Sequence, residues 1–389
     1  MNKQVAVIGG GIAGLSIARD LTLRNFDVVL FDKQKIGNGT TVQCAGMLHS
    51  GARYVTKDLK IAKLCLEENK IIQRIIPHAV GKKNAYFVRY IDDDLDYEKK
   101  FIEGCKKVGI PVRRISGDFA KQNEPKLGSK ISHAFETPDK VIDTFTLVFS
   151  YLDDLKKRSN VKIYESTEIK FANFNKDKWN IKTDKATFSF DFVINSSGDG
   201  LSQVSKLFGQ NIELSYIYGS MALFSGRLSS RIVTRCAPNA TGDVIVPAHK
   251  YTLIGSTWHE RDRRGIIKIN KEDEKEIRKI AGDMIPSARD ARLLSSLTGV
   301  RTHPKDDSYS GSFGDKRDFL IINHQDNNSG TYINFMSVLP GKMTIARYVA
   351  EQAGDIVCKR LNIKKKSITA ITPIKEPTNI PKRFKFYIN

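Results

Sequence analysis

The sequence predicts an α/β fold in which a doubly wound parallel sheet is interleaved with a separate antiparallel sheet. Two observations predict it. Within residues 3–23, an apolar run, a glycine-rich turn and an apolar helical stretch follow one another. Further along, runs of alternating or β-branched residues stand between segments of helical periodicity. At 389 residues, the chain is long enough for two domains of about 100–200 residues each.

The first strand and helix carry the most specific pattern. Residues 3–8 form a buried strand in this interpretation, and the G-x-G-x-x-G turn Gly9–Gly14 opens the helix. Gly9 permits the tight turn, and Gly11 lets the backbone approach a pyrophosphate. Gly14 allows the helix to pack closely on the strand, while the helix N-terminus attracts the phosphates. The order predicts a Rossmann-like dinucleotide site.

A second strand, Asp27–Phe31, leads to Asp32, whose carboxylate is placed to accept hydrogen bonds from ribose hydroxyls. The fingerprint alone does not separate FAD from NAD. Three further segments favour FAD: the glycine- and hydroxyl-rich loop Gly37–Thr41, the strand with small residues Asp191–Gly198, and residues Thr331–Thr344 before an apolar-faced helix. Such segments would cover a pyrophosphate, approach the cofactor closely and aim a helix N-terminus at the flavin.

The remaining elements predict two interleaved domains. Residues Asp58–Pro77 have the clearest helical periodicity, and the proline ends that helix. Strands are expected at Ala85–Tyr90, Ile131–Glu136, Ile212–Phe224, Gly242–Pro247 and Tyr251–Ser256. We therefore expect an FAD-binding domain from 1–80, 145–210 and 315–362, an antiparallel-sheet substrate domain from 81–144 and 211–314, and a basic C-terminal tail at 363–389.

Charge and cysteine content limit the partners. The net charge of +20 favours an anionic partner, either a phosphorylated substrate or anionic lipid headgroups, and no motif supports nucleic acid. A lysine- and isoleucine-rich composition of the source organism is the alternative explanation of this charge. The five scattered cysteines indicate neither a disulfide framework nor a metal cluster, so no metal is predicted. The longest charge-free runs are too short to span a bilayer. We expect a cytoplasmic protein, free or peripheral on the inner face of the membrane through its basic tail.

The segment Met47–Tyr54, MLHSGARY, resembles FAD-dependent glycerol-3-phosphate dehydrogenase, especially the anaerobic-type catalytic subunit of the D-amino-acid-oxidase-like flavoproteins. The resemblance runs from residue 1 to 362 and includes Gly9–Asp20, Ala62, Cys65, Glu68-Asn69, Glu124-Pro125, Val141–Asp143, Ile254–Thr257, Gly299–Arg301 and Gly341–Thr344. It departs from the family pattern at Pro340, Ile345 and Ala346, near the pyrimidine end of the flavin. The longer bacterial subunits carry a cysteine-rich extension that this sequence lacks, which implies another route for electrons to the acceptor.

The resemblance implies oxidation of sn-glycerol 3-phosphate to dihydroxyacetone phosphate, with hydride transfer from C2 to flavin N5 and electrons passed to a quinone or a partner protein. His49 is then the candidate base, since its unperturbed pKa lies near neutral. Arg53, Arg301 and Lys342 are the catalytic and phosphate-binding candidates, with Tyr54 and His259 also in the substrate pocket.

The fingerprint and the resemblance together predict cofactor contacts at Gly9, Gly11, Ile12, Ala13, Gly14, Asp32, Lys33, Gly39, Thr40, Thr41, Met47, Leu48, His49, Ile169, Ser197, Gly198, Gly341, Lys342, Met343 and Thr344. Two alternatives stay open. One is an L-2-hydroxyglutarate dehydrogenase or oxidase, or an amino-acid oxidase of the same superfamily. The other is a flavin-binding protein without turnover of its own.

Overall fold

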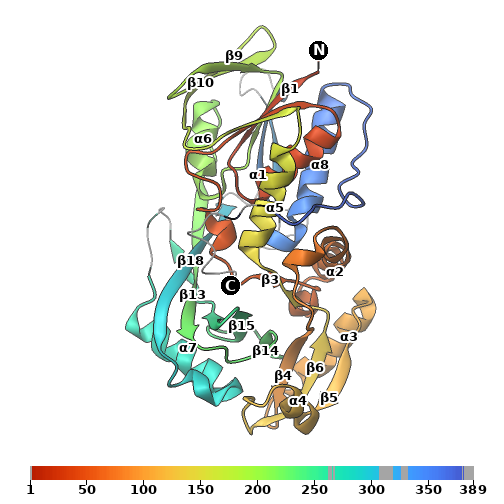
Figure 1. Ribbon diagram of the computed structural model, residues 1–389, viewed down its shortest axis with the longest axis vertical. Helices are drawn as coiled ribbons and strands as arrows, with labels where there is room; N and C mark the ends of the chain where they lie inside the picture. Colours follow the sequence, from red (N-terminus) through yellow and green to blue (C-terminus); the bar gives the residue numbers. More distant parts are fainter. Residues whose placement is uncertain are drawn as a thin grey trace.

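The computed structural model describes residues 2–261, 265, 268–305, 319–325, 332–378 and 380. A parallel sheet with its helices occupies one end of the molecule, and a large antiparallel sheet occupies the other (Figure 1). Two long strands, β13 and β18, run from the middle of the molecule into the second part (Figure 1). The expected α/β class, with a parallel and an antiparallel sheet, is confirmed.

The parallel sheet gathers strands from distant parts of the chain. In spatial order they are β19 (Leu320–Gln325), β20 (Tyr332–Leu339), β12 (Phe192–Asn195), β1 (Gln4–Ile8), β2 (Asp27–Phe31) and β8 (Val161–Tyr164). All neighbouring pairs are parallel except β19 with β20, which is antiparallel. Strand β1 is central, so the loop that follows it lies at the middle of the carboxyl edge, where such sheets bind ligands.

Alternate residues of β1 belong to two different cores. Val5 and Val7 pack with the helices α1 (Ile12–Leu23), α5 (Thr144–Lys156) and α8 (Ala346–Arg360). Ala6 and Ile8 face a core with Trp179 in the three-stranded sheet β9 (Ile169–Asn175), β10 (Lys178–Thr183) and β11 (Thr187–Phe190). Strand side chains point alternately to opposite faces, so both faces of the sheet are covered. The second face carries this small sheet and α6 (Leu201–Leu207), where a doubly wound fold would place helices alone.

The antiparallel sheet forms the body of the second part. Its order is β17 (His259–Arg261), β13 (Leu214–Ser225), β16 (Tyr251–Gly255), β15 (Val244–Ala248), β14 (Val233–Arg235), β4 (Ala85–Tyr90), β6 (Ile131–Thr137) and β5 (Arg113–Ser116), with β18 (Leu293–Pro304) along the other side of β13. The pair β14–β4 is parallel. The helices α3 (Leu95–Val108), α4 (Gly117–Asn123) and α7 (Lys271–Met284) lie in this part (Figure 1).

Helix α2 (Leu59–Ile75) lies near the junction of the two parts. Asp58 begins it by accepting hydrogen bonds from the backbone N–H groups of Lys60 and Ile61, and it ends just before Pro77. A short two-stranded ladder, β3 (Met47–Leu48) with β7 (Lys140–Val141), joins the segment before α2 to the end of β6. These contacts bring the predicted His49 segment between the two parts.

The described part of the C-terminal segment, which begins the expected basic tail, packs on the parallel-sheet part. The buried guanidinium of Arg24 donates to the carbonyl of Lys365 at 2.9 Å, and that of Arg19 to the carbonyl of Thr372 at 2.9 Å. Ile374 is buried and donates its N–H to Ile75 at 2.8 Å. Buried guanidiniums need acceptors, and this segment supplies them. The predicted basic–aromatic stretch at residues 382–386 lies outside the described residues.

The described residues contain neither a membrane-spanning helix nor a cluster of potential metal ligands. Of the helices in that part of the chain, none has both the length and the apolar character that crossing a membrane requires. Over the same ranges, no group of three or more His, Cys, Asp or Glu side chains is arranged to hold a metal ion. The five cysteines are free thiols.

Candidate active site

The turn after β1 has the geometry that its glycines require. Gly9 has a φ of +105°, and a Cβ there would lie 2.6 Å from the carbonyl oxygen of Ser196. A Cβ on Gly14 would lie 1.8 Å from the carbonyl oxygen of Gly9, so the helix sits directly on the turn. Gly11 is the N-cap of α1 and has no side chain to cap the helix. The first N–H groups of α1, those of Ile12 and Ala13, therefore lie at a glycine-lined turn, where a helix N-terminus suits a phosphate.

Asp32 lies beside this turn. One carboxylate oxygen accepts from the N–H of Gly10 at 2.7 Å, and the other from the N–H of Gln34 at 2.7 Å. Burial raises the pKa of Asp32, and these two backbone hydrogen bonds oppose that shift. Each carboxylate oxygen keeps a further lone pair for a ribose hydroxyl. The neighbouring Lys33 is exposed.

The loop after β2 reaches both parts of the molecule. The hydroxyl of Thr41 accepts from the N–H of Ile12 at 3.1 Å, directly at the start of α1. The hydroxyl of Thr40 faces the N–H of Val300 on β18 at 3.4 Å, while Gly39 has open space where a Cβ would stand. The structure thus brings the predicted pyrophosphate loop onto the glycine turn, in contact with the substrate-side strand.

A chain of hydrogen bonds stands behind the second predicted segment, Asp191–Gly198. Ser197, which precedes Gly198, donates its hydroxyl to Asn195 at 2.6 Å, and Asn195 donates to Ser205 at 2.9 Å. Ser205 and Ser337 are 3.1 Å apart, and Ser337 is 2.9 Å from Nε2 of His324. This network fixes the carboxyl end of β12 next to Gly9.

The structure places Ile169 differently from these residues. It is the first residue of β9 and is buried in the core between the two sheets. Any cofactor contact at this position would come from its backbone.

His49 follows β3 and is held between two distant segments. Its backbone N–H donates to the hydroxyl of Thr344 at 3.0 Å, in the turn η7 (Met343–Ile345) before α8. Its buried Nδ1 has no hydrogen-bond partner among the described residues and lies 3.6 Å from Oδ1 of Asp139. Burial lowers the pKa of His49; Asp139 opposes this, and Arg53 and Lys342 reinforce it. A histidine with a lowered pKa is neutral at neutral pH and can accept a proton.

One aromatic ring joins His49 to a cation. The rings of His49 and Tyr54 meet edge to face with centroids 5.3 Å apart. The ammonium of Lys342 lies over the same tyrosine ring, 4.9 Å from its centroid, and Lys342 is buried. Lys342 follows Gly341, whose φ is +64°. Three residues predicted for the substrate pocket are therefore brought together.

Arg301 lies on the face of the antiparallel sheet that meets the nucleotide loop. It is on β18, two residues from Gly299, so both point to the same face. A Cβ at Gly299 would lie 2.9 Å from the carbonyl oxygen of Gln43. The Arg301 guanidinium stacks over Trp258, 5.0 Å from its centroid, and Trp258 is 43% exposed. This position suits a cation that closes the site from the substrate side.

Arg53 and His259 are less available than the sequence predicted. Arg53 donates to Asn239 at 2.9 Å and forms an ion pair with the buried Asp243 at 3.0 Å. In the antiparallel register, His259 lies opposite Tyr218, whereas Arg301 lies opposite Ile217. Neighbouring residues of a strand point to opposite faces, so the side chain of His259 points away from the face that carries Arg301. Its Nε2 lies 3.0 Å from Asp273. The geometry therefore supports neither as a free ligand for the phosphate.

Sequence reasoning missed Asp139, a fully buried carboxylate that accepts from Ser50 and Thr137. It also missed how two residues of α2 hold the segment around His49. Asn69 donates to the carbonyl of Leu48 at 3.1 Å, and Glu68 pairs bidentately with Arg347 of α8. The only available signal for Asp139 was its place two residues before the Val141–Asp143 motif.

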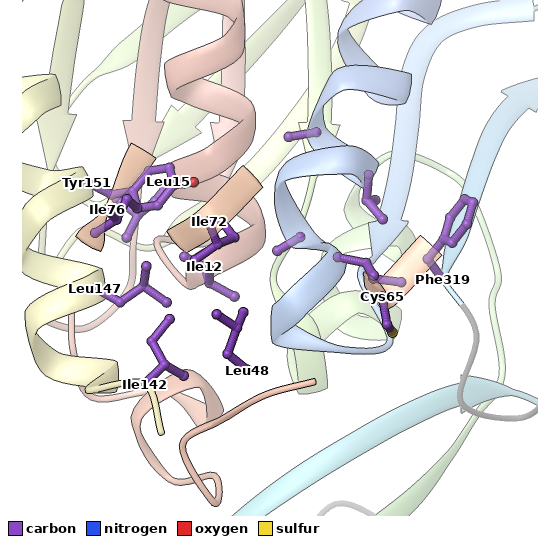
Figure 2. Close-up of a cluster of buried hydrophobic side chains, with 14 of the residues drawn as sticks. Ile12, Leu15, Leu48, Cys65, Ile72, Ile76, Ile142, Leu147, Tyr151 and Phe319 are labelled. Carbon is purple, nitrogen blue, oxygen red and sulfur yellow. The ribbon is translucent and has the colours of Figure 1, made fainter. Parts of the chain in front are cut away.

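An apolar cluster fixes the two ends of the site relative to one another. Ile12, at the start of α1, and Leu48, just before His49, line one small cavity together with Ile72, Ile142 and Leu147 (Figure 2). Met343 and Thr344 line the same cavity. The nucleotide turn and the His49 segment therefore share a packed core, so a cofactor spanning them would meet a preset geometry.

The residues present fit a dinucleotide cofactor. The evidence is the steric cradle at Gly9 and Gly14, which no side chain could occupy, together with the Asp32 carboxylate beside it. The strand, turn, helix and acidic residue are those that bind the adenosine and pyrophosphate of FAD.

Comparisons with known proteins agree with this geometry. The family model described as FAD dependent oxidoreductase matches residues 4–337. The chain is 30% identical to an anaerobic glycerol-3-phosphate dehydrogenase subunit of Haloferax volcanii, covering 96% of this chain and 66% of that protein. It is 28% identical to the corresponding protein of Haemophilus influenzae, covering 96% and 68%. The chain thus spans about two thirds of the length of these relatives.

Solved structures show the same fold. Glycine oxidase from Geobacillus kaustophilus superposes with a TM-score of 0.72 at 19% identity, covering 96% of this chain and 99% of that one. The glycerol-3-phosphate dehydrogenase from Bacillus halodurans, solved with FAD, gives 0.70 at 18% identity, covering 95% and 67%. With the match over residues 4–337, these findings establish that the chain belongs to the FAD-dependent oxidoreductase family and that its cofactor is FAD.

Proposed function

We propose that the protein oxidises the secondary alcohol of sn-glycerol 3-phosphate to the ketone of dihydroxyacetone phosphate. The observation that carries the proposal is that two groups contact the ring of Tyr54: the imidazole of His49, whose pKa is lowered, and the buried ammonium of Lys342. Such a pair combines a base for the hydroxyl proton with a cation for the phosphate. The relatives named as anaerobic glycerol-3-phosphate dehydrogenases support this substrate.

In this proposal, each residue has one task. When bound, FAD supplies the hydride acceptor at N5 of its isoalloxazine ring. His49 Nε2 takes the hydroxyl proton as the C2 hydrogen leaves with its electron pair. Arg301 and Lys342 bind the phosphate dianion, and the guanidinium fork of Arg301 suits two of its oxygens. Arg53, already paired with Asp243, acts on His49 at a distance by keeping its pKa low.

Anaerobic titration of the FAD-loaded protein tests the proposal. Glycerol 3-phosphate should bleach the visible flavin absorbance, whereas glycerol, which lacks the phosphate, should not. Bleaching by 2-hydroxyglutarate or an amino acid, without bleaching by glycerol 3-phosphate, would replace the proposal with the hydroxy-acid or amino-acid alternative. Full flavin occupancy with no bleaching by any of these compounds would indicate a flavin-binding protein without turnover.

We further propose that the electrons pass to a quinone or a partner protein at an anionic membrane surface on the cytoplasmic side. The net charge of +20 and the exposed side chains of Lys364, Lys365 and Lys366 support this location. Each basic residue near such a surface contributes about 1 kcal/mol of attraction. Sedimentation with anionic vesicles should therefore be strong at low salt and weak at high salt. Equal sedimentation with neutral vesicles would contradict an electrostatic origin.

A further inference from the structure

The imidazole of His49 has a defined orientation. Its backbone is held by Thr344, and its ring meets that of Tyr54 edge to face. Nδ1 is buried and points toward Oδ1 of Asp139 at 3.6 Å, which is longer than a normal hydrogen bond. In a five-membered ring, Nε2 then points away from Asp139. Catalytic hydrogen bonds are often long in a ligand-free site and shorten when the substrate binds.

Asp139 is built as an anion. Its side chain is fully buried, and Oδ1 accepts from the backbone N–H of Ser50 at 3.1 Å. Oδ2 accepts from the hydroxyls of Ser50 and Thr137. Burial alone would raise the pKa of Asp139, but His49 and the Ser50 hydrogen bonds outweigh it and hold the pKa below its usual value. Three donors from the protein thus keep one carboxylate charged beside His49.

We propose that Asp139 is the positioning residue for the base: it accepts a hydrogen bond from Nδ1–H of His49, which leaves Nε2 unprotonated toward the substrate. This inference rests on the proposed function. When the alcohol O–H bond breaks, its proton forms a bond with Nε2, and the hydride leaves C2 for FAD. The imidazolium so formed is buried, and the carboxylate of Asp139 stabilises its charge. Asp139 itself takes no proton.

The charges around His49 make this role necessary. Arg53 and Lys342 both disfavour an imidazolium, and burial disfavours it further. Tyr54 presents a ring rather than a charge. Among the described residues that act most strongly on His49, Asp139 is the one that favours its protonated form. Without Asp139, proton abstraction would place a third positive charge beside two cations in a buried site.

The variant Asp139→Asn tests the inference because it keeps the size and removes the charge. In anaerobic stopped flow with glycerol 3-phosphate, flavin reduction should slow by about 10²-fold or more. The rate requires neutral His49, so it rises with pH through the pKa of His49. Removing Asp139 lowers that pKa. The rising limb of the curve of reduction rate against pH should therefore move to lower pH, and the maximal rate at high pH should fall. A purely structural role would reduce the yield or flavin content and leave the limb in place.

Glu124→Gln is the matched control. Glu124 is also a buried carboxylate that accepts from a serine N–H and hydroxyl, those of Ser230, and it pairs with Arg231. Glu124→Gln also replaces a buried carboxylate by an amide, but away from the site. Its rate should therefore depend on pH as that of the wild type does. If Asp139→Asn behaves like Glu124→Gln, the inference is wrong while the proposed function stands. If wild-type protein is not reduced by glycerol 3-phosphate, the proposed function fails first.

A second measurement does not depend on the folding of the variant. In FAD-loaded wild-type protein labelled with ¹⁵N-histidine, the resonances of His49 should show the tautomer protonated at Nδ1 near neutral pH. The His49→Gln variant assigns these resonances by their loss. The tautomer protonated at Nε2 would overturn the inference, since the nitrogen facing the substrate could not then act as a base.

Discussion

The two ends of the site are built on different principles. The nucleotide end, at Gly9–Gly14, is shaped by backbone atoms that leave no room for a Cβ. The reaction end is shaped by buried side chains: His49, Asp139 and Lys342 come from segments far apart in the sequence and act through charge and proton affinity. Adding one atom to the steric cradle should abolish cofactor binding, whereas changing one charge at the reaction end should only reduce the rate or the affinity for substrate. The two ends should therefore respond to substitution on different scales.

The largest effect is expected at the nucleotide end. In Gly14→Ala, the new Cβ would lie 1.8 Å from the carbonyl oxygen of Gly9, so the helix must move off the turn. We expect loss of FAD from the purified protein and destabilisation of roughly 4 kcal/mol or more. Flavin absorbance and thermal unfolding measure both. In the control Gly265→Ala, the nearest atom of the described residues to the new Cβ is 4.0 Å away, at the hydroxyl of Tyr218. Full FAD retention by Gly14→Ala would show that the nucleotide end does not depend on the missing Cβ.

Substitution of the base should slow the reaction without releasing the cofactor. In His49→Ala, we expect glycerol 3-phosphate to reduce the flavin roughly 10²–10⁴-fold more slowly, the range for losing a general base. Its flavin content should stay that of the wild type, because His49 contributes no steric cradle. His133→Ala, on the remote strand β6, is the control. Normal kinetics in His49→Ala combined with slow kinetics in His259→Ala would reassign the base.

A smaller effect is expected from Arg301→Lys, which keeps the charge but loses the guanidinium fork. The loss should appear mainly in KM for glycerol 3-phosphate, roughly 10- to 100-fold, as expected for one charged hydrogen bond. A smaller loss in kcat is expected if the phosphate also orients C2. Arg113→Lys, with a largely exposed side chain, controls for the substitution itself. An unchanged KM would leave Lys342 as the phosphate ligand.

The smallest effect is expected for the pH dependence of stability, through His324 in the hydrogen-bond network behind the nucleotide end. Burial lowers the pKa of His324 to about 4 from its ordinary 6.5. Between these values the unfolded chain binds the extra proton, so stability falls as the pH drops below 6.5. The loss should reach about 2 kcal/mol at about pH 5. Denaturant unfolding with saturating FAD, compared between wild type and His324→Gln, measures it. Parallel pH dependence in the two proteins would contradict the assignment.

How much could be predicted from the sequence follows the same division. The nucleotide turn and Asp32 lie within the first 32 residues, so a short sequence motif was enough to predict that they are close in the fold. Asp139 lies 90 residues after His49, and the two are brought together by the ladder β3–β7 and by the hydrogen bonds from Ser50 to Asp139. No local pattern reports such a contact. The resemblance supplied His49 and Lys342, but it carried no information on the ion pair between Arg53 and Asp243.

Some secondary structure was missed for local reasons. Helix α7 has a strongly charged sequence with few apolar residues, of which Ile277 and Met284 are buried. Its start depends on a capping box between Asn270 and Asp273. In β9, the exposed Phe171 and Phe174 break the alternation that would indicate a half-buried strand. The α/β class was predicted correctly because it depends on the longer and more regular elements.

The contacts of α1 with the C-terminal segment have a consequence for synthesis. Arg19 and Arg24 follow the nucleotide turn directly, yet their buried guanidiniums bind the carbonyls of Thr372 and Lys365. Strand β1 likewise borders β12, which in turn borders β20. Helix α1 is therefore completed long after it is translated, because its partners in the C-terminal segment are translated about 340–350 residues later. Such non-local topology folds slowly, and we expect FAD to bind only after this segment has been translated, with chaperones protecting α1 until then.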